Sequence, residues 1–225
     1  MNILLTNDDG YFSEGIKLLF ELFSKKHNVV IVAPLTVMSA KSVSIILGRD
    51  VEVKKINDHT FAMDGTPADC VAFGLSSLNT KFDLVVSGCN HGLNISYDTI
   101  YSGTIGAGLQ ALTYRVPAIA FSSNEENFEH VKEYFENVLD YITHNKLLSN
   151  EYLLNVNFPI GNVVEGIEVT HIYYRKETTY YLKNGQDMYF ATRDLKDELC
   201  EDKHSDVYAV NHNIISITKI KRTLD

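Results

Sequence analysis

Short runs of apolar residues alternate with helical patterns, and this alternation constrains the fold more than any other feature of the sequence. Ile3–Leu5 and Val29–Val32 are continuous apolar runs that are typical of buried strands, and between them the apolar residues of 16–23 recur at about the helical period. A strand, a helix and a second strand in this order form a β-α-β unit, which implies a parallel sheet. Because the strands are apolar on both faces, we expect helices on both sides of the sheet.

The alternation continues along the chain. Thr66 followed by Pro67 is typical of a helix start, with threonine as the N-cap and proline in the first turn. The other expected elements are a small hairpin over 51–63, strands at 84–86, 118–121 and 153–158, a glycine- and asparagine-rich loop over 87–102, and helices at about 103–114 and 128–144. We expect 153–158 to be the last strand of the core, in an α/β fold with a mostly parallel sheet.

The composition changes after Pro159, where tyrosines accumulate. Asn184-Gly185 lies between the β-rich runs 179–182 and 188–190, which predicts a β-hairpin. A two-stranded hairpin with exposed aromatic residues is marginally stable on its own, so it should pack either on its own domain or on another subunit. We therefore divide the chain into a core over residues 1–160 and a C-terminal region over residues 161–225 that completes the same domain.

Charge and composition exclude several classes of partner. The formal net charge is −9 and there is no long basic run, so a polymeric nucleic acid is not expected as a ligand. No stretch approaches the roughly 20 apolar residues that span a bilayer, and the first residues do not resemble a secretory signal. We expect a soluble cytoplasmic protein with no membrane partner, whose cysteines Cys70, Cys89 and Cys200 are reduced thiols outside any C-x-x-C pair.

Polar residues with oxygen-bearing side chains follow the predicted strands. Asp8 and Asp9 follow the first strand, Ser39 lies in the loop after the second, and Asn90 and Asn94 follow the strand at 84–86. In open α/β sheets, ligands bind outside the carboxyl ends of the strands. We therefore expect these side chains to gather at one edge of the sheet.

The adjacent carboxylates of Asp8 and Asp9 indicate a cation. Two carboxylates so close repel each other unless a positive charge lies between them, although a plain polar loop or a helix cap would use the same residues. The hydroxyl of Ser39 and the amide of Asn90 are hard oxygen donors that suit Mg²⁺, Mn²⁺ or Ca²⁺. Zinc is disfavoured because the loops offer few His or Cys side chains, and we expect Cys89 and His91 to be structural. This pattern favours a hard divalent cation.

Small residues over 102–108 precede an apolar helix. Backbone N–H groups at such a helix N-terminus bind anions, so a phosphate fits there, although glycines also allow close contact between helices. The sequence lacks a P-loop motif and a dinucleotide fingerprint. A hard-metal site beside an anion site indicates phosphoryl transfer or hydrolysis, in which the metal would activate water.

Five motifs, in this order and spacing, resemble those of the SurE family of 5′/3′-nucleotidases. They are Asn7-Asp8-Asp9-Gly10, Ser39, Gly65-Thr66-Pro67-Ala68-Asp69-Cys70, Ser87-Gly88-x-Asn90-x-Gly92-x-Asn94 and Tyr101-Ser102-Gly103-Thr104. The resemblance is strong over about residues 1–125 and weaker beyond. It implies a Rossmann-like, three-layer catalytic domain that hydrolyses nucleoside 5′- and 3′-monophosphates, with the C-terminal hairpin exchanged between the subunits of a homodimer or homotetramer.

The resemblance also implies the site residues. One divalent metal per subunit, Mg²⁺ or Mn²⁺ (or Ca²⁺ in a crystal), would be held by Asp8, Asp9, Ser39 and Asn90. The phosphate would lie among Asn94, Ser102, Gly103 and Thr104. Asp8 or Asp9 would also be catalytic, as the general base. Leu35 and Met38 depart from the family pattern, and they leave open the alternative of a non-catalytic sensor of metal and nucleotide phosphate.

Overall fold

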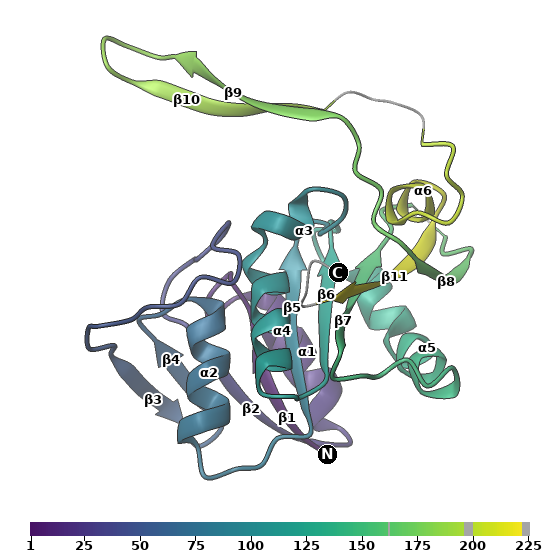
Figure 1. The fold of residues 1–225 in the computed structure, drawn as a ribbon. Helices are drawn as coiled ribbons and strands as arrows, with labels where there is room; N and C mark the ends of the chain where they lie inside the picture. The colour runs from purple at the N-terminus through teal and green to yellow at the C-terminus, as the bar shows by residue number, and fades with distance from the viewer. Residues whose placement is uncertain (162, 196–199, 222–225) are drawn as a thin grey trace.

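The structure is a computed structural model that describes residues 1–161, 163–195 and 200–221 (Figure 1). Within these ranges, nine strands form one sheet in the order β3-β4-β2-β1-β5-β6-β7-β11-β8, and β9 and β10 form a separate pair. The strands are β1 (Asn2–Thr6), β2 (Asn28–Pro34), β3 (Val53–Asn57), β4 (Thr60–Met63), β5 (Leu84–His91), β6 (Ala118–Ser123), β7 (Tyr152–Phe158), β8 (Gly166–Thr170), β9 (Glu177–Lys183), β10 (Tyr189–Leu195) and β11 (Ile214–Lys221). The helices are α1 (Glu14–Ser24), α2 (Pro67–Ser77), α3 (Asp98–Tyr101), α4 (Gly103–Thr113), α5 (Glu129–His144) and α6 (Asp206–Asn211).

The centre of the sheet is parallel, which confirms the predicted fold class. Strands β4, β2, β1, β5, β6 and β7 pair in parallel with their neighbours, and the antiparallel pairs are β3 with β4 and β7 with β11. Helices α1 and α5 cover one face, and α2 and α4 cover the other (Figure 1). The result is the expected Rossmann-like arrangement of three layers.

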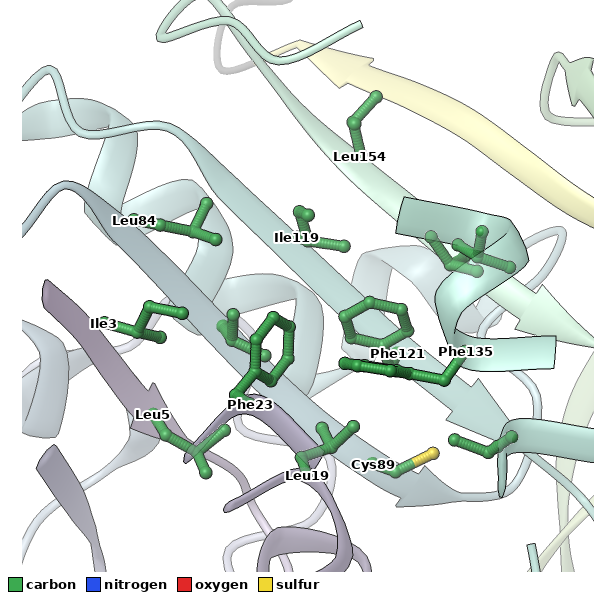
Figure 2. Close-up of a cluster of buried hydrophobic side chains, with 14 of the residues drawn as sticks. Ile3, Leu5, Leu19, Phe23, Leu84, Cys89, Ile119, Phe121, Phe135 and Leu154 are labelled. Carbon is green, nitrogen blue, oxygen red and sulfur yellow. The ribbon is translucent and has the colours of Figure 1, made fainter. Parts of the chain in front are cut away.

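Each face of the sheet packs against its helices through a continuous apolar layer. Figure 2 shows the larger layer, where Phe23 of α1 meets Phe135 of α5 edge to face, with ring centroids 4.8 Å apart, above Phe121 of β6. Consecutive residues of β1 serve both layers, because Ile3 and Leu5 belong to this layer and Leu4 belongs to the opposite one. Burial on both faces is the reason that β1 has a continuous apolar sequence.

The prediction that 153–158 is the last core strand is wrong. Beyond β7 the sheet continues into β11, and β8 pairs in parallel with β11 at the edge. In β11, Ile215 and Ile217 join the apolar layer, whereas Ser216 and Thr218 are also buried. Their hydroxyls lie 2.7 and 2.8 Å from the hydroxyl of Thr170 in β8. A strand with hydroxyls buried on one face lacks the continuous apolar run that identifies the central strands.

The strands that approach the polar edge are longer than predicted. The loop expected from Ser87 begins only after His91, because β5 extends to that residue and pairs with the end of β6, where Asn90 lies opposite Ser122. The register shifts between Ser87 and Asn90, so the pairing tolerates an irregular stretch. The same predicted loop contains the short helix α3. Tertiary pairing with β6 overrides the low strand propensity of glycine and asparagine here.

Two local predictions are confirmed. Thr66 caps α2 in a capping box with Asp69, and Pro67 occupies the first turn. The Asn184-Gly185 pair lies in the loop of a hairpin formed by β9 and β10, closed by a hydrogen bond from the Asn184 N–H to the Met188 carbonyl at 2.7 Å. This hairpin projects beyond the body of the molecule (Figure 1).

Among the helices in the described ranges, none has the length and apolar character needed to cross a membrane.

Candidate functional site

A cavity of about 330 Å³ lies at the carboxyl edge of the parallel strands. Its lining includes six of the eight predicted site residues: Asp8, Asp9, Ser39, Asn90, Asn94 and Ser102. The other two, Gly103 and Thr104, lie directly behind it, where both contact Asp8. The expected gathering of these residues at one edge of the sheet is therefore observed.

The turn after β1 brings the two carboxylates to this edge. The buried amide of Asn7 donates hydrogen bonds to the Gly10 carbonyl at 3.0 Å and to the Ser13 hydroxyl at 2.7 Å. Gly10 has a φ of +97°, a conformation that L side chains rarely adopt. The side chain of Asn7 thus closes the turn around Asp8 and Asp9 and fixes its shape.

Asp8 is the most buried charged group of the cavity, with 4% of its surface exposed. The hydroxyl of Thr104 donates a hydrogen bond of 2.5 Å to its carboxylate. Burial raises the pKa of Asp8 to about 6; the hydrogen bond from Thr104 opposes this rise, and the negative charge of Asp9 adds to it. Thr104 is fully buried, so it contacts Asp8 and does not line the cavity.

Burial also raises the pKa of Asp9, against a hydrogen bond from the His91 backbone and the charge of that histidine. Two neighbouring carboxylates that both resist ionisation form a site that a cation would stabilise. Such a cation would favour the ionised form of Asp8 and Asp9 together.

The loop that carries Ser39 is held against α3, the turn after β1 and α4. The Ser42 N–H donates to the Tyr101 carbonyl at 2.9 Å, and the Met38 N–H donates to the Asp8 carbonyl at 2.7 Å. At Gly106, an added Cβ would lie 1.9 Å from the Ser42 carbonyl oxygen. The close-contact interpretation of these glycines thus holds at Gly106.

The start of α4 faces the cavity. Ser102 is the N-cap of α4, and its hydroxyl accepts from the Ile105 N–H at 3.2 Å. At Gly103, an added Cβ would lie 2.9 Å from the Asp8 Cβ. Because Ser102 also lines the cavity, the positive end of the helix dipole is available to an anion bound there.

Gly106→Ala is expected to destabilise the fold by about 1–3 kcal/mol, because the new methyl group has no room beside the Ser42 carbonyl. The displaced loop carries Ser39, so the lining of the cavity should be disturbed as well. Gly166→Ala is the matched control, since nothing lies within 4 Å of its added Cβ. Thermal denaturation of both variants measures the difference, and equal melting temperatures would contradict the close contact.

Asn90, near the end of β5, and Asn94, in the loop that follows, are held in different ways. Asn90 donates its amide nitrogen to the Gly92 carbonyl at 2.8 Å, which leaves its amide oxygen for a ligand in the cavity. Asn94 is fixed from β7, because the Asn157 side chain accepts from its backbone N–H at 2.8 Å and the Asn155 side chain donates to its carbonyl at 2.7 Å. Both β7 residues are fully buried and act on the cavity through Asn94.

The donor set fits a hard divalent metal. Within the described ranges, no three His, Cys, Asp or Glu side chains lie close enough together to hold a metal ion. An ion in this cavity would therefore depend on the hydroxyl of Ser39 and the amide oxygen of Asn90, together with the carboxylates of Asp8 and Asp9. Oxygen donors of these kinds suit Mg²⁺ or Mn²⁺.

Cys89 and His91 differ in their position. Cys89 is fully buried in the apolar layer against α1, where burial raises the pKa of its thiol, so its predicted structural role is confirmed. His91 instead lines the cavity beside Asp9. The structural role of His91 stays a prediction, because the residue lines the cavity and its ring also meets that of Phe128 edge to face, with centroids 6.0 Å apart.

The residues of the lining that the sequence did not predict include Asp98, Tyr101 and Arg193, besides Ala40 and Leu93. Asp98 and Tyr101 come from α3, and Arg193 comes from β10 in the hairpin. No local pattern distinguishes Asp98 or Arg193 from other surface residues, whereas Tyr101 begins the motif Tyr101-Ser102-Gly103-Thr104 without a predicted role. Arg193 reaches the cavity because the base of the hairpin lies against α3, where its guanidinium bonds to Asp98 and lies over the ring of Tyr101.

Comparisons with known proteins find SurE proteins that match almost the whole chain. The family model described as "Survival protein SurE" matches residues 3–179. Two proteins of Clostridium botulinum, each named "5′-nucleotidase SurE", are 35% identical (strain Alaska E43 / Type E3) and 36% identical (strain Loch Maree / Type A3). The matches cover 98% of this chain and 93% and 92% of those proteins. The crystal structure of the SurE protein from Aquifex aeolicus is similar with a TM-score of 0.86 at 32% identity, over 100% of this chain and 95% of that one.

Proposed function

The chain belongs to the SurE family, and on that premise we infer that it is a 5′-nucleotidase, which hydrolyses nucleoside 5′-monophosphates to nucleoside and phosphate. The observation that carries this function is the cavity in which the buried pair Asp8 and Asp9 lies beside neutral oxygen donors and the start of α4. A phosphomonoester needs such a combination, because its charge must be neutralised and a water molecule must be activated. We extend the proposal to nucleoside 3′-monophosphates.

We propose that the enzyme depends on one divalent metal per subunit, Mg²⁺ or Mn²⁺, held by Asp8, Asp9, Ser39 and Asn90. When bound, the metal would neutralise charge on the phosphate and lower the pKa of water. The hydrogen bond from Thr104 keeps the carboxylate of Asp8 oriented. Asp9 is less buried than Asp8, and its carboxylate accepts a hydrogen bond from the backbone of His91. It is therefore better placed to accept the proton of the attacking water.

The phosphate is proposed to bind at the start of α4 and beside Asn94. The N–H groups of Gly103 and Thr104 belong to the first turn of that helix, where the dipole favours a negative charge. Ser102 lines the cavity at the same point. The buried network from Asn155 and Asn157 holds Asn94 in place, so that its position does not relax when the substrate leaves.

We further propose that the chain forms a homodimer or homotetramer through the hairpin, with residues 161–225 as the oligomerisation region of the same domain. Apolar side chains lie exposed along β9, β10 and their connection: Tyr180, Tyr181, Leu182, Met188, Tyr189 and Phe190. An exposed apolar surface of this kind is typical of an interface.

We place the reaction in the cytoplasm, where nucleotides are made and where the free thiols of Cys70, Cys89 and Cys200 stay reduced.

Phosphate release from a panel of nucleoside 5′- and 3′-monophosphates tests the function. With Mg²⁺ or Mn²⁺ we expect steady release, and with excess EDTA we expect the rate to fall to the background of a sample without protein. Restoring the metal should restore the rate. Release that EDTA does not affect would refute metal dependence. Folded protein that releases no phosphate with any metal would refute the enzyme and favour a sensor of metal and nucleotide.

A further inference from the structure

Arg193 has no assigned role, yet it lies in the cavity with the carboxylates. Among the described residues that line this cavity, it is the one lysine or arginine. It comes from β10, where it pairs with Thr179 of β9 close to the base of the hairpin. The positive charge of Arg193, a residue of the hairpin, therefore lies in the same cavity as the four residues that we propose as metal ligands.

Three groups hold the guanidinium in its present position. It donates a hydrogen bond to the Asp98 carboxylate, lies 3.8 Å from the Glu177 carboxylate, and lies over the ring of Tyr101 at 5.0 Å from the centroid. A guanidinium has five N–H donors in a planar fork, and this hydrogen bond uses one of them. The contact with the face of Tyr101 uses none of the N–H donors, so the remaining donors can meet an anion.

The charges in the cavity require a further cation once a substrate binds. Asp8, Asp9 and Asp98 contribute three carboxylates. A phosphomonoester carries a charge of about −1.5 to −2 at neutral pH. A divalent metal offsets the charge of Asp8 and Asp9 alone, so the substrate phosphate would add its charge beside that of Asp98. Arg193 is the residue of the lining that can offset part of this charge by direct contact with the phosphate.

The side chains of Arg193 and Asp98 are 35% and 33% exposed. An ion pair with this degree of exposure contributes little stability, whereas an arginine binds a phosphate through two parallel charge-assisted hydrogen bonds. We propose that Arg193 is a substrate-binding residue, whose guanidinium leaves Asp98 and binds the phosphate of the nucleotide. The proposal rests on the proposed nucleotidase function.

A purely structural role is the competing explanation. The base of the hairpin holds a charge cluster in which Arg175 lies 4.0 Å from Asp98 and 3.9 Å from Glu177. In that case Arg193 would only fix the hairpin to α3. The two roles make opposite predictions for Asp98→Asn, because this change releases Arg193 towards a phosphate but removes the attachment of the hairpin.

The test compares Arg193→Gln, Arg193→Lys, Asp98→Asn and the control Arg175→Gln, which alters the same cluster outside the cavity lining. The readouts are kcat and KM for a nucleoside monophosphate, the inhibition constant of inorganic phosphate, and the thermal shift that inorganic phosphate causes in the presence of Mg²⁺. For Arg193→Gln we expect about a tenfold or larger rise in KM and in the inhibition constant, with a smaller change in kcat. Arg193→Lys should restore part of the loss, and Asp98→Asn should lower both constants.

Three outcomes would overturn the proposal. They are an unchanged phosphate inhibition constant in Arg193→Gln, a rise in KM for Asp98→Asn that matches Arg193→Gln, and an equal loss in Arg175→Gln. The thermal shift does not require turnover. One combination of results separates the two proposals: inorganic phosphate shifts the melting temperature of the wild type but not of Arg193→Gln, and the wild type releases no phosphate from nucleotides. This combination would refute the proposed function and still support the phosphate-binding role of Arg193.

Discussion

Asp8→Asn is expected to lower kcat for nucleoside monophosphates by at least about a hundredfold, because changes even to residues behind metal ligands cost about ten- to a hundredfold. The fold should persist. Burial already disfavours the charge of Asp8, and an asparagine oxygen still accepts the hydrogen bond from Thr104. Steady-state phosphate release with saturating Mg²⁺ or Mn²⁺ measures the loss. A second readout is the melting temperature with and without metal, whose increase should disappear in the variant.

Asp64→Asn is the matched control for this experiment, because Asp64 is an exposed carboxylate on the surface, paired with Arg49. It should retain both the turnover and the metal-induced rise in melting temperature. Turnover of Asp8→Asn within a few fold of the wild type would remove Asp8 from the proposed metal site. An unfolded Asp8→Asn protein would show instead that its carboxylate is structural.

A double substitution in the hairpin should weaken the proposed association between copies by at least about a thousandfold. Leu182 and Phe190 lie directly opposite each other in β9 and β10, and 52% and 62% of their surfaces are exposed. In a symmetric dimer each substitution occurs twice, and central apolar residues of an interface contribute about 2 kcal/mol or more each. Leu182→Ser with Phe190→Ser should therefore be monomeric at micromolar concentration, where we expect the wild type to be a dimer or tetramer by analytical ultracentrifugation.

Leu47→Ser with Ile160→Ser controls for a general loss of exposed apolar surface, since both residues are exposed on the body of the molecule. This pair should associate like the wild type. A wild-type protein that sediments as a monomer would reject the assembly, and a hairpin variant that still associates would place the interface elsewhere.

The parts of the site that the sequence predicts are those encoded by a short stretch of chain. Asp8 and Asp9 directly follow a strand that is buried on both faces, and parallel strands end at one edge, so their position follows from an apolar run and a polar turn. The same applies to Thr66 and Pro67, whose capping chemistry is local. These features need no knowledge of distant contacts.

The remaining features depend on contacts between distant residues. Thr104 bonds to Asp8 across 96 positions, and Arg193 reaches Asp98 across 95 positions. No periodicity encodes either pair. The strand β11 escapes prediction for a related reason, because its buried Ser216 and Thr218 share a hydroxyl partner, Thr170, that lies in another strand. A polar residue signals burial only when its partner is known.

The position of β11 between β7 and β8 also bears on how the chain folds during its synthesis. Strand β7 lacks its second neighbour until residues 159–221 have left the ribosome, which takes several seconds at about 5–20 residues per second. During this interval the strands from β1 to β7 are already available, including the turn that carries Asp8 and Asp9. The free side of β7 is then an unpaired strand edge, which is a surface on which another chain can pair until β11 covers it.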